Sequence, residues 1–177
     1  MSASRFADRL TAQVANEFAA SQQYIAIAVH YDADALPQLA GLFYRQSVEE
    51  RNHAMMIVRY ILDREWSVEI PGMDEVRNTF EKPVDLITLA LEREKTVTEQ
   101  IEALFRAARA EDDALGEQFM LWFLKEQVEE VASMATLVAI AERAGDDWFR
   151  IEEHLTREAV GDAGLDASAP EAAGGTL

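Results

Sequence analysis

The stretch Glu49-Glu50-Arg51-Asn52-His53 decides the fold of this chain. It lies in residues 37–64, where apolar residues recur at the spacing of a helix. Glu50 and His53 stand in the apolar stripe of that helix, which should pack against other helices. A buried carboxylate is costly unless it is paired or bound to a metal, and a Glu and a His three residues apart are placed to share a divalent cation. The alternative is an accidental pair, since the chain has 33 acidic residues.

Helical periodicity and turn signals predict four long helices and one short one. Pro37 and Pro83 suit the first turn of a helix, and Gly145 suits the position just after one. The predicted helices are residues 4–31, 37–64, 83–108, a fourth that ends before Gly145, and a short fifth of residues 146–160. The fold class is therefore all-α.

The link between the second and third helices decides the topology. Residues 66–81 lose the helical period and contain Pro71-Gly72, a strong turn signal. A helix of about 28 residues is roughly 42 Å long, and sixteen extended residues reach roughly 53 Å. The link is thus long enough to return along the bundle, which predicts a four-helix bundle made of two hairpins and a long crossover.

Polar residues interrupt the apolar stripe of every long helix at one level. Measured from the two hairpin turns, they fall within a layer roughly 5 Å thick. A shift of 77 residues relates the two hairpins, with Glu17, Glu50 and His53 corresponding to Glu94, Gln127 and Glu130. Buried carboxylates without a cation would repel one another, and two divalent ions would relieve that repulsion. Oxygen donors with one imidazole favour iron or manganese, although zinc competes for such sites.

These residues and their neighbours resemble the ferroxidase centre of bacterial non-haem ferritins. The resemblance covers residues 5–160, including the crossover and the fifth helix, and implies a ferritin-like fold. It rests on Glu17, Tyr24, Glu49, Glu50, His53, Glu94, Glu126, Gln127, Glu129 and Glu130.

By this resemblance the layer is a di-iron ferroxidase centre. Glu17, Glu50 and His53 would hold the first iron, with Glu50 bridging to the second. Glu94, Glu50 and Glu130 would hold the second iron.

The resemblance also implies roles for the remaining residues. A third, weaker iron site would be formed by Glu49, Glu126, Glu129 and Glu130. Tyr24 and Gln127 would orient ligands or meet oxygen.

The differences from related families exclude some cofactors. Bacterioferritins carry a haem-binding Met where this chain has Arg51, so no haem is expected. Met55 and Met56 are interpreted as core residues. Rubrerythrins need a cysteine-bound iron, and this chain has no Cys.

The resemblance implies an iron-storage ferritin that oxidises Fe(II) with O2 and stores the Fe(III) mineral. About 24 subunits would close into a cage. The alternative is a discrete di-iron oxygenase or oxidase that acts on an organic substrate, but the helical stripes suggest no apolar substrate pocket. Trp122 is interpreted as a packing residue. Asp113 and Glu117 would line a channel for iron or simply begin the fourth helix.

The composition of the chain limits which binding partners and which cellular location are expected. The net charge of −17 argues against binding nucleic acid or an anionic membrane, and no stretch has the features of a signal peptide or a membrane span. A cytoplasmic protein is expected. Residues 1–160 form the predicted domain, and residues 161–177, rich in Gly, Ala and Asp, are predicted to be a disordered tail. Such a tail could dock into a partner protein.

Overall fold

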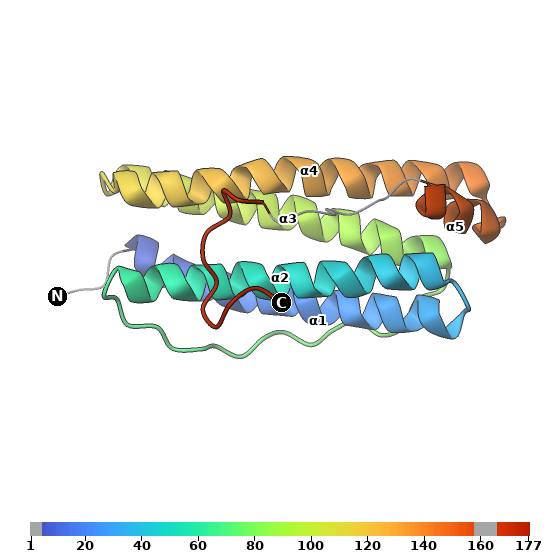
Figure 1. Cartoon of the computed structure of the whole chain (residues 1–177), viewed down its shortest axis with the longest axis horizontal. Coiled ribbons are helices and arrows are strands. Elements are labelled where there is room, and N and C mark those ends of the chain that lie inside the picture. Colours follow the sequence, from blue (N-terminus) through green and yellow to red (C-terminus); the bar gives the residue numbers. More distant parts are fainter. Residues whose placement is uncertain (1–4, 158–165) are drawn as a thin grey trace.

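The computed structural model describes residues 5–157 and 166–177, and within them the chain forms five α-helices and no strand. The helices are α1 (Arg5–Ala33), α2 (Pro37–Asp63), α3 (Pro83–Ala110), α4 (Ala114–Ala144) and α5 (Trp148–Arg157). Short turns join α1 to α2 and α3 to α4, so the bundle consists of two antiparallel hairpins (Figure 1). The predicted fold class is confirmed, and the predicted last turn of the fifth helix lies outside the described residues.

The crossover, residues 64–82, runs along the bundle beside α1 and α2 (Figure 1). Gln23, which is buried in α1, forms hydrogen bonds with Arg77 of the crossover. The side-chain amide of Gln23 donates to the carbonyl oxygen of Arg77 at 2.8 Å, and its oxygen accepts from the backbone N–H of Arg77 at 2.8 Å. This paired contact satisfies both polar groups of a buried amide and fixes the path that returns the chain to the start of α3.

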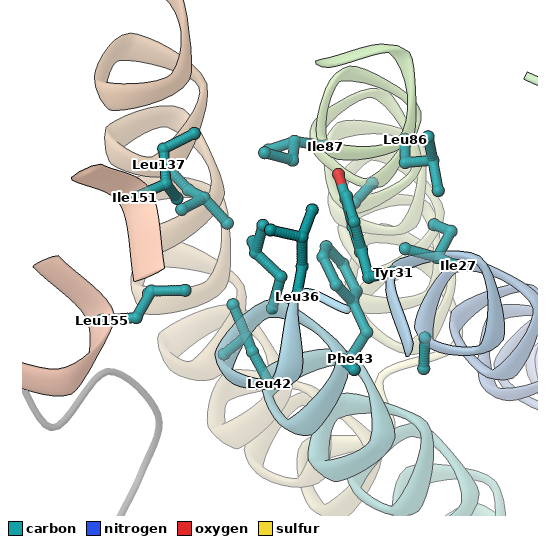
Figure 2. Close-up of a cluster of buried hydrophobic side chains, with 14 of the residues drawn as sticks. Ile27, Tyr31, Leu36, Leu42, Phe43, Leu86, Ile87, Leu137, Ile151 and Leu155 are labelled. Carbon is teal, nitrogen blue, oxygen red and sulfur yellow. The ribbon is translucent and has the colours of Figure 1, made fainter. Parts of the chain in front are cut away.

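The hydrophobic core is divided into two clusters by the polar layer. The first cluster lies toward the α1–α2 turn, where Tyr31 and Phe43 stack at 5.8 Å and where Ile151 and Leu155 of α5 pack (Figure 2). The second lies toward the opposite end of the bundle and includes Phe6, Leu10, Ile57, Ile101 and Phe123. Each cluster holds all four long helices together, so the layer between them is fixed from both sides.

The fifth helix is tied to the bundle by a carboxylate. Leu36, at the N-cap of α2, provides no side-chain hydrogen bond. Glu152 of α5 supplies the capping hydrogen bonds instead. Its two oxygens accept from the backbone N–H groups of Gln38 at 2.8 Å and Leu39 at 2.9 Å. The first turn of a helix has free N–H groups and a positive dipole end, so a carboxylate is the favoured cap.

Residues 166–177 lie against α2 and α4 (Figure 1). The indole N–H of Trp122 donates to Asp166 at 3.0 Å, and the backbone N–H of Ala173 donates to the carbonyl oxygen of Met55 at 3.0 Å. Ala169, Ala172 and Ala173 of this segment pack against the second cluster of the core, and the disordered tail that composition suggests for residues 161–177 stays a prediction. Residues 161–165 lie outside the described residues.

None of the described helices combines the length and the apolar content that crossing a bilayer requires.

Candidate metal centre

The structure brings the six polar residues of the predicted layer together. They come from all four long helices, and each is at most 7% exposed. They are Glu17 of α1, Glu50 and His53 of α2, Glu94 of α3, and Gln127 and Glu130 of α4. The helical period places each of them on the inner face, and the hairpin turns set them at one height.

Within this layer the ligand atoms form overlapping groups. One atom each of Glu17, Glu50 and His53 lie within 4.8 Å of one another, and the same is true of Glu50, Glu94 and Glu130. Glu50 belongs to both groups, and its Oε2 lies 3.5 Å from Nδ1 of His53. A carboxylate shared by two ligand sets is the arrangement that suits two cations bridged by one side chain.

Carboxylate oxygens in the layer are left without partners. Among the described residues no hydrogen bond reaches Oε2 of Glu17, Oε2 of Glu50, Oε2 of Glu94 or Oε1 of Glu130. A buried acceptor without a donor costs about 1–3 kcal/mol, and more when it is charged. Carboxylate oxygens and one imidazole are donors that iron accepts, so the residues present fit the predicted metal.

The layer is electrostatically unfavourable without a cation. Burial and the nearby carboxylates of Glu130 and Glu94 raise the pKa of Glu50 well above its ordinary value. Burial and Glu94 likewise raise the pKa of Glu130 well above its ordinary value. Divalent cations would offset both the desolvation and the repulsion.

Two polar side chains donate hydrogen bonds to the carboxylates of the second group. The hydroxyl of Tyr24 donates to Oε1 of Glu94. The amide of Gln127 donates to Oε2 of Glu130 at 2.7 Å, while its oxygen lies 2.9 Å from the hydroxyl of Thr98. Thr98 was not identified from the sequence, although it lies one helical turn after Glu94.

The three other predicted acids occupy different environments. Glu49 contributes to a third group of ligand atoms with His53 and Glu130, again within 4.8 Å. Glu126 is buried, with an exposed fraction of 9%, but belongs to no such group among the described residues. Glu129 is exposed and also outside these groups. Neighbouring residues on a helix point about 100° apart, which turns Glu129 away from Glu130.

A cavity of about 650 Å³ opens beside the layer. Its walls come from α2, α4 and residues 166–177, and include Glu49, His53, Trp122 and Asp166. The helical stripes suggested no apolar substrate pocket, and this cavity takes one of its walls from residues 166–177, outside those stripes. The cavity was missed because one of its walls belongs to the segment that was predicted to be disordered.

The remaining candidates have structural contacts. Trp122 packs edge-on against His53, with ring centroids 5.7 Å apart, in agreement with a packing role. Asp113 caps α4 and pairs with Arg64 at 3.0 Å, and Glu117 pairs with Arg109 at 2.8 Å. These ion pairs favour the interpretation of both acids as part of the α4 N-terminus.

A helical bundle with a long crossover and a buried layer of carboxylates defines a metal-binding protein of the ferritin-like class. A family model described as Ferritin-like domain matches residues 7–144. The chain is 62% identical over 165 residues to Ferritin BfrB of Mycolicibacterium smegmatis, covering 93% of this chain and 91% of that protein. It is 32% identical over 140 residues to the bacterial non-heme ferritin of Staphylococcus aureus, covering 79% of this chain and 84% of that protein.

The fold is also that of a solved structure. An open pore ferritin from Archaeoglobus fulgidus superposes with a TM-score of 0.84 at 24% identity, covering 89% of this chain and 98% of that chain. The chain belongs to the ferritin family. It is accordingly an iron-storage protein that binds iron.

Proposed function

We propose that the buried layer is a ferroxidase centre that oxidises Fe(II) before storage. Glu17, Glu50 and His53 hold one iron, and Glu50, Glu94 and Glu130 hold the other. The observation that carries this proposal is the membership of Glu50 in both ligand groups, each with its ligand atoms within 4.8 Å. One carboxylate can then bridge two substrate ions and keep them close enough to react with a single oxygen molecule.

The chemistry requires two electrons to leave the iron pair together. Each Fe(II) gives one electron to O2, which takes up two protons and leaves as hydrogen peroxide. The carboxylates stabilise the higher charge of the Fe(III) product. Tyr24 and Gln127 hold Glu94 and Glu130 in place during this change, since each donates to one carboxylate oxygen.

A third iron site beside the pair would receive ions on their way to the mineral. Its ligands are Glu49, Glu126, Glu129 and Glu130. The closeness of Glu49 to Glu130 and His53 supports it. The exposed carboxylate of Glu129 would serve at the outer edge of this path, because it belongs to none of the tight groups among the described residues.

The assembly we propose is a cage of about 24 subunits with cubic symmetry, acting in the cytoplasm and without haem. Arg51 stands where a haem-binding Met would be needed. The segment that ends the chain would be free to engage a partner protein when it leaves α2 and α4.

The alternative of a discrete oxygenase acting on an organic substrate has one supporting observation, the cavity beside His53. Family membership favours the ferritin function over it.

Aerobic addition of Fe(II) to the purified protein, followed by size-exclusion chromatography, tests the proposal. The expected result is a large assembly that carries iron far in excess of two ions per subunit. Oxygen consumption should approach one O2 for two Fe(II) in the first additions. A small, mineral-free species that binds only a few ions would favour the oxygenase.

A further inference from the structure

The carboxylates of Glu94 and Glu130 in the layer have the same hydrogen-bond arrangement. Oε1 of Glu94 accepts from the Tyr24 hydroxyl, and Oε2 of Glu130 accepts from the Gln127 amide at 2.7 Å. The other oxygen of each carboxylate has no hydrogen-bond partner among the described residues. Each carboxylate therefore has one oxygen fixed by a neutral donor and one that remains for a cation.

Glu17 has the same arrangement, with a donor that the resemblance did not identify. The side-chain amide of Gln13 donates to Oε1 of Glu17 at 2.8 Å. Oε2 of Glu17 has no partner within the described part of the chain. Gln13 is only 2% exposed and lies one helical turn before Glu17 on α1.

The carboxylate of Glu17 fixes which end of the Gln13 side chain faces it, because an ionised carboxylate only accepts hydrogen bonds and the amide nitrogen of Gln13 lies 2.8 Å from it. Asn16 donates to the oxygen of Gln13 at 3.1 Å. The amide nitrogen of Gln13 also lies 3.3 Å from the oxygen of Gln100 on α3. Both contacts agree with this orientation, in which the amide of Gln13 donates toward Glu17.

We propose that Gln13 is a positioning residue of the iron-binding layer, which holds Glu17 so that one oxygen only is presented to the metal. The inference rests on the proposed ferroxidase function of this layer. An oxygen that accepts a hydrogen bond is a poorer ligand, and Glu17 then binds through a single atom and leaves a coordination position for oxygen or water. Without Gln13, the carboxylate is free to rotate or to bind through both oxygens.

Anaerobic titration of the assembled protein with Co(II) tests the proposal without turnover. Absorption bands of Co(II) report both the occupancy and the coordination number of each site. In the wild type we expect two ions per subunit. In Gln13→Met, which keeps the length but removes the donor, one of the two should bind about tenfold more weakly. The intensity of its bands should also change, while the second ion should bind as before.

Gln13→Leu serves as a second replacement, so that a folding defect in one variant leaves the other informative. Gln100→Met is the matched control, because it removes a contact of Gln13 but retains the bond to Glu17. Its affinities should equal those of the wild type. Wild-type affinities and spectra in a folded Gln13 variant would overturn the proposal, as would an equal loss in Gln100→Met. Absence of paired Co(II) binding in the wild type would instead overturn the proposed centre itself.

Discussion

The carboxylate of Glu152 on α5 accepts a hydrogen bond from the backbone N–H of Leu39 on α2, at 2.9 Å, across 113 residues of sequence. A second bond, from the N–H of Gln38, uses the other oxygen. The start of a core helix is thus capped by the shortest and last described helix. This relationship links the placement of α5 to the stability of the bundle.

Glu152→Ala should lower the free energy of unfolding by about 0.5–2 kcal/mol, as the loss of an N-cap does. Thermal unfolding followed by circular dichroism would measure the change. Glu153→Ala is the matched control, since Glu153 is exposed on α5 and, within the described part of the chain, forms an ion pair with Arg157 of the same helix. An equal effect in both variants would show that the carboxylate of Glu152 does not act as a cap.

Replacing Glu50 or His53 by Ala should leave a folded assembly but slow the first Fe(II) oxidation by at least about tenfold. Each residue belongs to two ligand groups, so its loss weakens more than one ion position. Stopped-flow absorbance after mixing with Fe(II) gives the rate. Glu92→Ala, an exposed position two residues before Glu94, should match the wild type. Wild-type rates in the Glu50 and His53 variants would place the reaction elsewhere.

Glu49→Ala should spare the first oxidation and alter the later ones, because Glu49 shares a ligand group with His53 and Glu130 but is absent from the two groups that contain Glu50. Glu129→Ala should have the smaller effect, since Glu129 is exposed. Repeated additions of Fe(II), with the oxygen consumption of each addition measured by an oxygen electrode, would distinguish the effects of the two variants. Unchanged oxygen stoichiometry over all additions in Glu49→Ala would argue against a third site.

The stability of the metal-free protein should fall as the pH rises. The folded-state pKa values of Glu50 and Glu130 lie well above the ordinary 4.5, so the folded state binds protons that the unfolded state has lost. Their contribution is fully present below about pH 4.5 and is lost as the pH rises through the folded-state values. Melting temperatures across this range should decline, and Glu50→Gln should flatten the slope.

Added Zn(II) should remove most of the decline of the melting temperature with rising pH, because a bound cation stabilises the ionised carboxylates. Glu92→Gln is the control for the general effect of lowering the negative charge. A slope that is the same with and without Zn(II) would contradict the assignment of the layer as a cation site.

Asp166→Ala should release residues 166–177 while the bundle stays folded. Asp166 accepts from the Trp122 indole and lies 3.7 Å from the ammonium of Lys125, so it is the charged anchor of this segment. Hydrogen exchange of the C-terminal peptide should become faster. Glu171→Ala, at an exposed position of the same segment, should keep the wild-type exchange. Slow exchange in Asp166→Ala would show that backbone contacts such as Ala173 to Met55 suffice.

The sequence predicted the bundle and its layer because both depend on local geometry. A helical period fixes which face Glu17 and Glu94 present, and the short turns fix their height. Gln13 stood in the same buried stripe, one turn before Glu17, and its polarity there was a usable signal. Contacts that depend on packing between distant segments were not predictable. Glu152 meets α2 only after α5 has docked, and Asp166 meets Trp122 only after the end of the chain has turned back.

The division of the core has a consequence for how this protein tolerates change. Ile27 and Leu10 belong to different clusters with the carboxylate layer between them, and the costs of substitutions at distant, unconnected sites add. A cavity in one half is therefore not aggravated by a cavity in the other. Over evolutionary time the two apolar halves are free to change independently of each other, while the carboxylate layer between them must keep its residues.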